Sequence, residues 1–132
     1  DGNGRSENDL FMDGSEIFNF AITNVHNNIN DLIKYFSWEK DDVKKYFLHQ
    51  ANNFMVDYVR KKLKVDKEQV PQNVTNYGNT GPSTIPLLLS DLYNNKEENL
   101  DKVIMSGFGV GLSWGAIACN LNNTIFYKPI NS

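Results

Sequence analysis

Hydrophobic residues in the first third of the chain recur every three or four positions. From Ser15 to Phe36 this spacing marks one face of an amphipathic helix. Asp13 and Glu16 stand at the start of that helix with the spacing of a capping box. The apolar positions are Phe18, Ala21, Ile22, Val25, Ile29, Leu32, Ile33 and Phe36. A short second helix is expected from Ser37, which can cap it, to Lys45, because acidic residues fill its first turn.

Shorter apolar runs, separated by polar and glycine-rich breaks, predict the remaining elements. Two further helices are expected at about 52–63 and 83–93, each opened by a residue that can cap it. The expected strands are 46–49, 70–77, 102–106 and 112–121.

Helices and strands alternate along the chain until the last two strands, which follow one another directly. Such alternation is typical of an α/β protein with a mostly parallel mixed sheet covered by helices on both faces. The last two strands are joined only through Gly107–Gly111, which leaves no room for a crossover helix, so we expect them to pair antiparallel. In sheets of this class the functional site lies at the carboxyl ends of the strands.

Length, net charge and the counts of cysteine and histidine exclude several classes of function. The 132 residues suffice for one domain, and we expect residues 1–11 to form a loop and residues 12–132 to form the folded domain. The net charge of −3 gives the whole chain no attraction for nucleic acid. The most apolar stretch is interrupted by polar residues and glycines, so we expect no membrane segment. A single cysteine excludes an internal disulfide and fits a cytoplasmic protein, and two histidines are too few for a typical zinc site.

The strongest chemical signal is a histidine and an asparagine placed at the ends of two successive expected strands. His49 lies in His-Gln-Ala-Asn, and Asn79 lies in Gly-Asn-Thr-Gly-Pro. Taken alone, His49 also fits a histidine near the core, and Asn79 also fits a turn or a helix cap. Together, an imidazole N–H and a carboxamide N–H can donate to one developing oxyanion, which is the chemistry of thioester decarboxylation and condensation.

The glycine-rich segment Gly107–Gly115 does not match a nucleotide-binding motif. Leu112 and Trp114 occupy the positions where a G-x-G-x-x-G pattern needs its third glycine, and no helix is expected to follow. A tight turn between two strands, with a backbone N–H free to face an oxyanion, is one interpretation. A plain hairpin with bulges is the other.

Two other features have simple structural interpretations. Cys119 lies inside the last expected strand without an adjacent cation, so we interpret it as a packed small hydrophobe rather than a nucleophile. The basic run Arg60–Lys64 fits the solvated end of a helix, where its charges complement the helix dipole.

Five segments together resemble the C-terminal half of β-ketoacyl-ACP synthase III, a thiolase-fold condensing enzyme. They are Met12–Phe18, His49–Asn52, Lys61–Leu63, Gly78–Thr80 and Gly107–Gly115. Their order and spacing agree with the family, and the resemblance runs from Met12 to about Leu121. It implies that residues 12–132 form a C-terminal thiolase-like domain.

The resemblance implies an active site of cysteine, histidine and asparagine. Its cysteine would lie in an N-terminal half outside this chain and would take an acyl group from acyl-CoA. His49 and Asn79 would bind the malonyl thioester carbonyl and stabilise the enolate formed by decarboxylation. The product would be that of a decarboxylative Claisen condensation with malonyl-ACP. The oxyanion hole for the acyl thioester would be formed by the backbone of Phe108, Gly109, Val110 and Gly111.

The resemblance also implies binding partners. Asn52 and Gly14 would lie at the site of the CoA or malonyl substrate, and Lys61 and Lys62 would receive the acidic acyl carrier protein. The substrates are CoA and carrier-protein thioesters, with no cofactor and no metal. The whole enzyme is expected to be a cytoplasmic homodimer that contains the N-terminal half of the same polypeptide.

Three departures from the family pattern keep other functions open. Val110 replaces a glycine of the family's triple glycine, while Phe54 and Asn19 stand where relatives often carry basic residues. One alternative is a non-catalytic domain that binds CoA or a carrier protein. Another is an acyltransferase on the same scaffold, with an alcohol or amine as acceptor. The isolated chain is expected to be inactive in condensation, since the nucleophilic cysteine would be absent.

Overall fold

A computed structural model describes residues 13–109 and 111–130. The predicted loop 1–11 and residue Val110 lie outside the described residues. The helices are α1 (Gly14–Tyr35), α2 (Asn53–Leu63), α3 (Val74–Tyr77) and α4 (Thr84–Leu92). The strands are β1 (Lys45–Leu48), β2 (Val103–Gly109) and β3 (Ser113–Cys119). Short 3₁₀ turns occupy Lys40–Asp42, Lys67–Gln69 and Gly81–Ser83.

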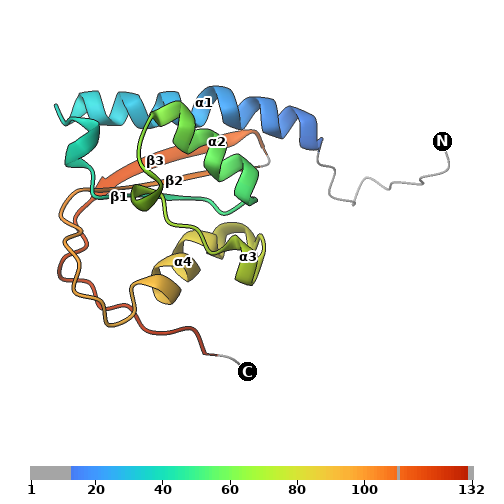
Figure 1. The fold of residues 1–132 in the computed structure, drawn as a ribbon. Coiled ribbons are helices and arrows are strands. Elements are labelled where there is room, and N and C mark those ends of the chain that lie inside the picture. The colour runs from blue at the N-terminus through green and yellow to red at the C-terminus, as the bar shows by residue number, and fades with distance from the viewer. Residues whose placement is uncertain (1–12, 110, 131–132) are drawn as a thin grey trace.

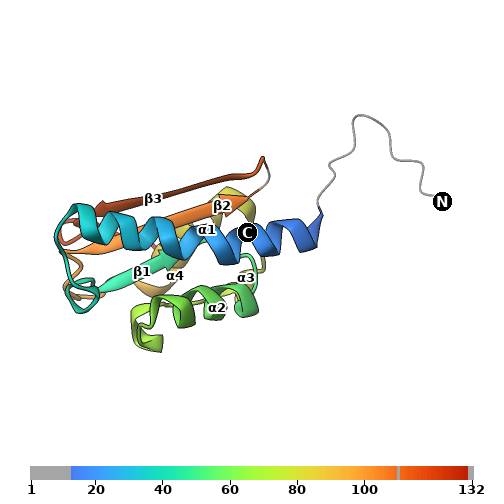
Figure 2. The ribbon, with the colours of Figure 1, turned by 90° about the horizontal axis from the view of Figure 1, so that it is seen from above.

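The three strands form one mixed sheet in the order β1-β2-β3 (Figure 2). β1 runs parallel to β2, with Lys45 opposite Val103 and Leu48 opposite Ser106. β3 runs antiparallel to β2, so the predicted pairing of the last two strands is confirmed. The described sheet therefore contains one parallel and one antiparallel pair.

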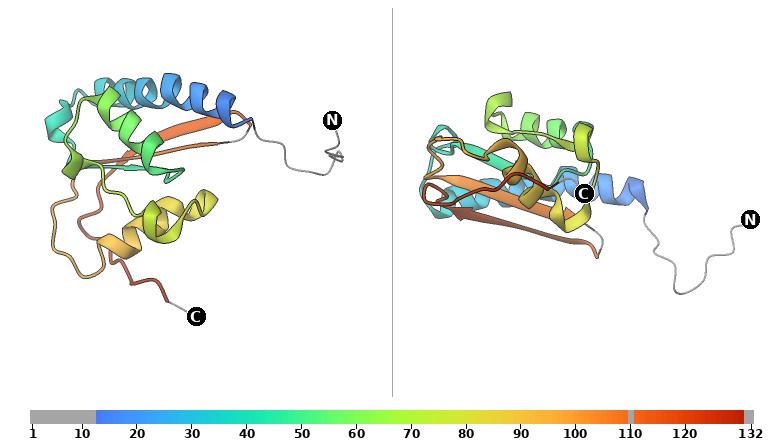
Figure 3. Two further views of the ribbon diagram at one scale, coloured as in Figure 1. Left: turned by 45° about the vertical axis from the view of Figure 1, so that its right-hand side comes forward. Right: turned by 90° about the horizontal axis from the view of Figure 1, so that it is seen from below.

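Helices cover both faces of this sheet, as the alternation predicted (Figure 1). Successive side chains of a strand point to opposite faces. Tyr46 and Leu48 of β1 accordingly pack with α1 and α2, whereas the intervening Phe47 packs with α4. The segment that follows β3 runs on the α4 side, where Phe126 joins the same cluster as Phe47 (Figure 3).

The predicted amphipathic helix is confirmed as α1. The Asp13 carboxylate caps it by accepting the N–H groups of Ser15 and Glu16 at 2.8 and 3.0 Å. The buried face consists of Ala21, Val25, Ile29 and Ile33. The predicted helix that begins near Asn52 is confirmed as α2, and the one near 83–93 as α4.

The predicted helix from Ser37 to Lys45 is wrong. Ser37 adopts a left-handed conformation with φ of 53°, and the Trp38 N–H donates to Ile33 O at 3.0 Å. This geometry ends α1 instead of starting a new helix. The acidic residues form only a 3₁₀ turn, in which Asp42 accepts the N–H of Glu39 at 3.0 Å.

The predicted strand 70–77 is also wrong, because its second half is the single helical turn α3. Pro71 has no N–H to offer a neighbouring strand. The Asn73 N–H, which a sheet ladder would need, donates instead to the side chain of Gln50 at 3.2 Å. Asn79 therefore follows a helical turn and not a strand, which corrects the premise that placed it at a strand end.

None of the helices in the described part of the chain has the length and apolar character that a bilayer crossing requires. Across residues 13–109 and 111–130, no three His, Cys, Asp or Glu side chains gather in a way that could hold a metal ion.

Candidate active site

His49 lies directly after β1 and contacts two other elements. Its N–H donates to Ser106 O at 2.9 Å, which extends the parallel pairing one residue beyond the strand. Its ring nitrogen Nδ1 is 2.7 Å from Oγ1 of Thr84, the first residue of α4. The ring of Phe108 in β2 packs edge-to-face on the imidazole, with ring centroids 5.2 Å apart and an interplanar angle of 85°. Side chains of two other elements, α4 and β2, therefore fix the imidazole at the end of β1.

The surroundings of His49 favour the neutral imidazole. Partial burial lowers the pKa of His49, because an apolar environment disfavours the charged ring. A neutral imidazole carries one N–H. When the Thr84 hydroxyl donates to Nδ1, that proton lies on Nε2, and Nε2 has no protein hydrogen-bond partner among the described residues. The ring can then act as a neutral hydrogen-bond donor at the carboxyl end of β1.

Thr84 is a site residue that the sequence interpretation assigned only to a helix start. Its side chain is buried, at 2% exposure, and its hydroxyl is the only protein partner of the His49 ring nitrogens in the described part of the chain. A threonine five positions after Asn79 gives no motif signal, because the contact with His49 depends on the path of the intervening turn.

Asn79 lies on the surface between two glycines in positive φ. Gly78 has φ of 69° and Gly81 has φ of 63°, conformations that other residues adopt at a cost. The Asn79 carboxamide oxygen accepts the N–H of Gly81 at 3.0 Å. This local turn leaves the NH₂ group of Asn79 available to donate to a ligand. Within the described residues no hydrogen bond joins Asn79 to His49. Asn79 is connected to His49 only indirectly, through the chain segment that leads on to Thr84, whose hydroxyl contacts the His49 ring.

Gln50, the residue after His49, ties the end of β1 to the segment that precedes Asn79. It is buried, at 1% exposure. Its amide donates to Leu48 O at 2.7 Å, and its carbonyl accepts the N–H of Asn73 at 3.2 Å. Gln50, the second residue of the His-Gln-Ala-Asn motif, thus has a structural role: its hydrogen bonds hold the backbone on both sides.

The predicted oxyanion turn follows β2. Phe108 pairs with Trp114 and Gly109 pairs with Ser113 across the antiparallel ladder. Gly111 has φ of 135°, and a Cβ added there would lie 2.8 Å from Oγ of Ser113. Phe108 touches His49, so the hairpin adjoins the imidazole. The oxyanion role of Phe108, Gly109 and Gly111 stays a prediction, and Val110 lies outside the described residues.

Asn52 and Gly14, the predicted substrate contacts, lie at the first turns of two helices. The Asn52 carboxamide oxygen accepts the N–H of Met55 at 2.8 Å and caps α2. Gly14 is the first residue of α1 and is exposed. Their substrate-binding roles stay predictions.

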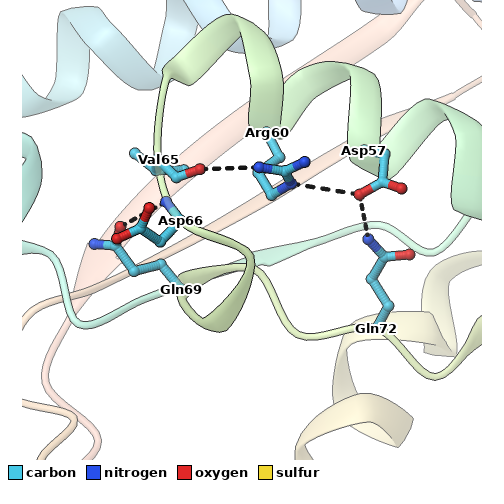
Figure 4. Close-up of polar contacts among 6 residues, drawn as sticks. All are labelled: Asp57, Arg60, Val65, Asp66, Gln69 and Gln72. Atoms are coloured by element: carbon cyan, nitrogen blue, oxygen red, sulfur yellow. Dashed lines mark hydrogen bonds and ion pairs between the residues drawn. The ribbon is translucent and has the colours of Figure 1, made fainter.

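The residues of the basic run at the end of α2 have different surroundings. Lys61 and Lys62 are exposed, and the ammonium group of Lys62 lies 5.5 Å from the centroid of the Tyr58 ring. Arg60 instead holds the turn after the helix, since its guanidinium donates to Val65 O at 3.2 Å and to Asp57 at 3.4 Å (Figure 4). The lysines are therefore available to a partner, while Arg60 is engaged in the fold.

Cys119 lies in β3 on the α4 side, half-buried. Burial raises the pKa of its thiol, which is the opposite of what activates a nucleophile. This environment agrees with the interpretation of Cys119 as a packing residue.

Comparisons with known proteins identify the family and its extent. Residues 34–121 match the family described as 3-oxoacyl-[acyl-carrier-protein (ACP)] synthase III C terminal. The β-ketoacyl-[acyl-carrier-protein] synthase III of Streptococcus agalactiae is 43% identical over 111 residues, which are 82% of this chain and 34% of that protein. That of Lactococcus lactis is 41% identical over 115 residues, 85% of this chain and 35% of that protein. The chain thus spans about a third of the length of the curated relatives it matches.

Solved structures agree with this assignment. The 3-oxoacyl-(acyl-carrier protein) synthase of Burkholderia xenovorans superposes with a TM-score of 0.81 at 38% identity, over 95% of this chain and 37% of that one. The priming β-ketosynthase of the R1128 polyketide pathway superposes with a TM-score of 0.77 at 25% identity, over 91% of this chain and 35% of that one. The fold is therefore thiolase-like, as the resemblance implied. The chain belongs to the C-terminal family of 3-oxoacyl-[acyl-carrier-protein] synthase III.

Proposed function

We propose that this chain supplies the histidine and asparagine of a ketoacyl-ACP synthase III active site that joins acyl-CoA to malonyl-ACP. The observation that carries the proposal is the environment of His49. Its pKa is lowered by burial, its Nδ1 is engaged by Thr84, and its Nε2 is left for a ligand. A donor of this kind suits an enolate oxygen, whereas a charged imidazolium would be expected at a simple anion site.

The proposed reaction uses the chain's own groups as hydrogen-bond donors. His49 Nε2–H and the Asn79 NH₂ donate to the thioester carbonyl of the malonyl group. The carbon–carbon bond to the carboxylate then breaks and CO₂ leaves, while the electron pair of that bond stays on the α-carbon and forms the enolate. The enolate carbon attacks the acyl thioester carbon, and the cysteine thiolate leaves as the new carbon–carbon bond forms.

The proposal places the nucleophilic cysteine in an N-terminal part of the same enzyme. An apolar cavity of about 600 Å³ lies between α4 and the β2–β3 hairpin. Its walls include Pro82, Ile85 and Leu89 on one side and Gly107, Ala116 and Ile117 on the other. Ile117 is 59% exposed. An apolar surface of this kind favours contact with further protein, which supports the N-terminal half as its occupant.

The proposed partner surface for the acyl carrier protein is the exposed side of α2. Lys61 and Lys62 would contact acidic groups of the carrier. Phe54, which is 67% exposed and stacks on Phe18 with centroids 5.7 Å apart, adds an apolar contact at the first turn of the same helix. We also propose that the complete enzyme is a homodimer in the cytoplasm.

The test uses the complete enzyme, in which this chain is joined to the N-terminal part. Incubation with a panel of acyl-CoAs, followed by intact mass measurement, should show an acyl adduct in the wild type and in Asn79→Ala. Decarboxylation of malonyl-ACP should fall by about 10²–10³ in Asn79→Ala, the usual cost of losing one oxyanion donor. Asn27→Ala on the exposed face of α1 serves as the matched control and should keep the wild-type rate.

Other outcomes would contradict the proposal in distinct ways. An adduct that is discharged by simple alcohols or amines but not by malonyl-ACP would identify an acyltransferase. Binding of CoA without any adduct would identify a non-catalytic binding domain. Wild-type decarboxylation in Asn79→Ala would exclude the proposed role of the asparagine.

A further inference from the structure

One carboxylate on α4 holds both ends of the turn α3. Asp91 accepts the side-chain amide of Asn73 at 3.1 Å through Oδ2, and the hydroxyl of Tyr77 at 3.0 Å through Oδ1. Asn73 is the residue that precedes α3, and Tyr77 is its last residue. Both carboxylate oxygens of Asp91 are therefore used on a single helical turn.

The same turn is connected to the catalytic end of β1. The backbone N–H of Asn73, a residue only 5% exposed, donates to the buried side chain of Gln50. A continuous chain of hydrogen bonds thus runs from the residue after His49, through Asn73, to Asp91 and Tyr77. It brings together three segments that lie far apart in the sequence.

Asn79 needs support of this kind because its own surroundings provide little. α3 has four residues, too few for a helix that is stable on its own. Gly78, directly before Asn79, and Gly81, two residues after it, have no atom within 4 Å of an added Cβ. The side chain of Asn79 is exposed, and its described hydrogen bond is local. On the N-terminal side of Asn79, the nearest side-chain contacts that hold the chain are thus those of α3.

We propose that Asp91, acting through Tyr77 and Asn73, is a positioning residue for Asn79. This inference rests on the proposed function, since it assigns Asn79 its role as a donor to the enolate. Asp91 does not touch the substrate. It fixes α3, and α3 fixes the turn from which the Asn79 NH₂ group donates.

The main test removes one hydroxyl. Tyr77→Phe in the complete enzyme should lower kcat for malonyl-ACP decarboxylation about tenfold, because small misplacements of a catalytic group are costly. The KM for malonyl-ACP should change less than about twofold, since Asn79 acts mainly in the transition state. Asp91→Asn keeps the shape but turns one of the two accepting oxygens into an NH₂ donor, so it should lower kcat at least as much.

A double-mutant cycle separates positioning from general stability. If Tyr77 acts through Asn79, Tyr77→Phe should cause no further loss of kcat in an Asn79→Ala background. The same tenfold loss in both backgrounds would overturn the inference, as would a wild-type kcat in Tyr77→Phe. Should Asp91→Asn fail to fold, the Tyr77→Phe cycle still decides the question.

Matched controls make the outcome specific. Tyr127→Phe removes the hydroxyl of a tyrosine that is 76% exposed, and Asp31→Asn neutralises an exposed carboxylate on α1. Both should keep the wild-type kcat. If Asn79→Ala itself keeps the wild-type rate, the proposed function fails first, and that result is distinct from a failure of the cycle.

Discussion

His49 and Asn79 are held in opposite ways. The imidazole lies half-buried where β1, β2 and α4 meet, and side chains from two of these elements touch it directly. The carboxamide lies exposed in a turn between two glycines, and its support comes from Asp91 and Gln50 through the preceding turn. The comparison shows that one site can combine a group fixed by the sheet with a group fixed by a side-chain network. Variants of Thr84, Phe108 and Gly81 test the two kinds of support separately.

Among these variants, the largest loss of activity is expected when the hydrogen bond between Thr84 and His49 is removed. Thr84→Val keeps the shape of the side chain but removes the hydroxyl beside Nδ1. The kcat for malonyl-ACP decarboxylation should fall about fivefold to thirtyfold, because a hydrogen bond to a half-buried group is worth about 1–2 kcal/mol. Thr84→Ser retains the hydroxyl and should retain most of the activity. Full activity in Thr84→Val would show that the ring does not depend on this contact.

A smaller effect is expected from pH. Burial lowers the pKa of His49, so the imidazole of the folded protein stays neutral to lower pH than in the unfolded chain. Decarboxylation should therefore fall only below pH of about 6.5, the ordinary pKa of histidine. Phe108→Ala exposes the ring, and the midpoint of the pH–kcat profile should then move upward. An unchanged midpoint would show that the contact with Phe108 does not cause the burial that lowers the pKa of His49.

The lowered pKa of His49 also makes the folded state less stable as pH falls. Because the folded pKa of His49 is depressed, the unfolded chain binds this proton first as pH falls. His49 should thus lower the free energy of unfolding as pH decreases from about 6.5 through the folded pKa, and have no effect above that window. Comparison of His49→Gln with the wild type by thermal unfolding at several pH values measures this contribution.

The smallest effect is expected in the turn that carries Asn79. Gly81→Ala places a side chain at φ of 63°, which costs about 1–2 kcal/mol. The midpoint of thermal unfolding should fall by a few degrees, and the decarboxylation rate should fall with it if the strain is relieved by moving Asn79. Asn27→Ala on the exposed face of α1 is the control and should change neither quantity.

The parts of the fold that depend on local periodicity were predictable from the sequence. The apolar spacing of α1 and the helix start at about residue 52 depend on interactions within a few residues, and both predictions are confirmed. The helix after Ser37 was wrong because the left-handed residue at the end of α1 takes priority over a favourable acidic first turn. The strand at 70–77 was wrong because its backbone donor is taken by Gln50, which is more than 20 positions away in the sequence.

The candidate site was predictable in its motif residues but not in its supports. His49 and Asn79 stand in recognisable short motifs. Thr84, Asp91 and Tyr77 have ordinary sequence surroundings, and only the path of the chain brings them to the site. Contacts between distant side chains leave no local pattern, so a single sequence cannot indicate them.

The register of the sheet has a consequence for the order in which the chain folds. β2 and β3 are joined by a short turn, whereas Lys45 of β1 pairs with Val103 across 58 positions. Closing the longer loop costs more chain entropy, so we expect the hairpin to form early and β1 to dock late. His49 follows β1 directly, and its contacts with Phe108 and Thr84 need that docking. The imidazole would then enter its surroundings only when the rest of the sheet is in place, so that partly folded chains carry no assembled site.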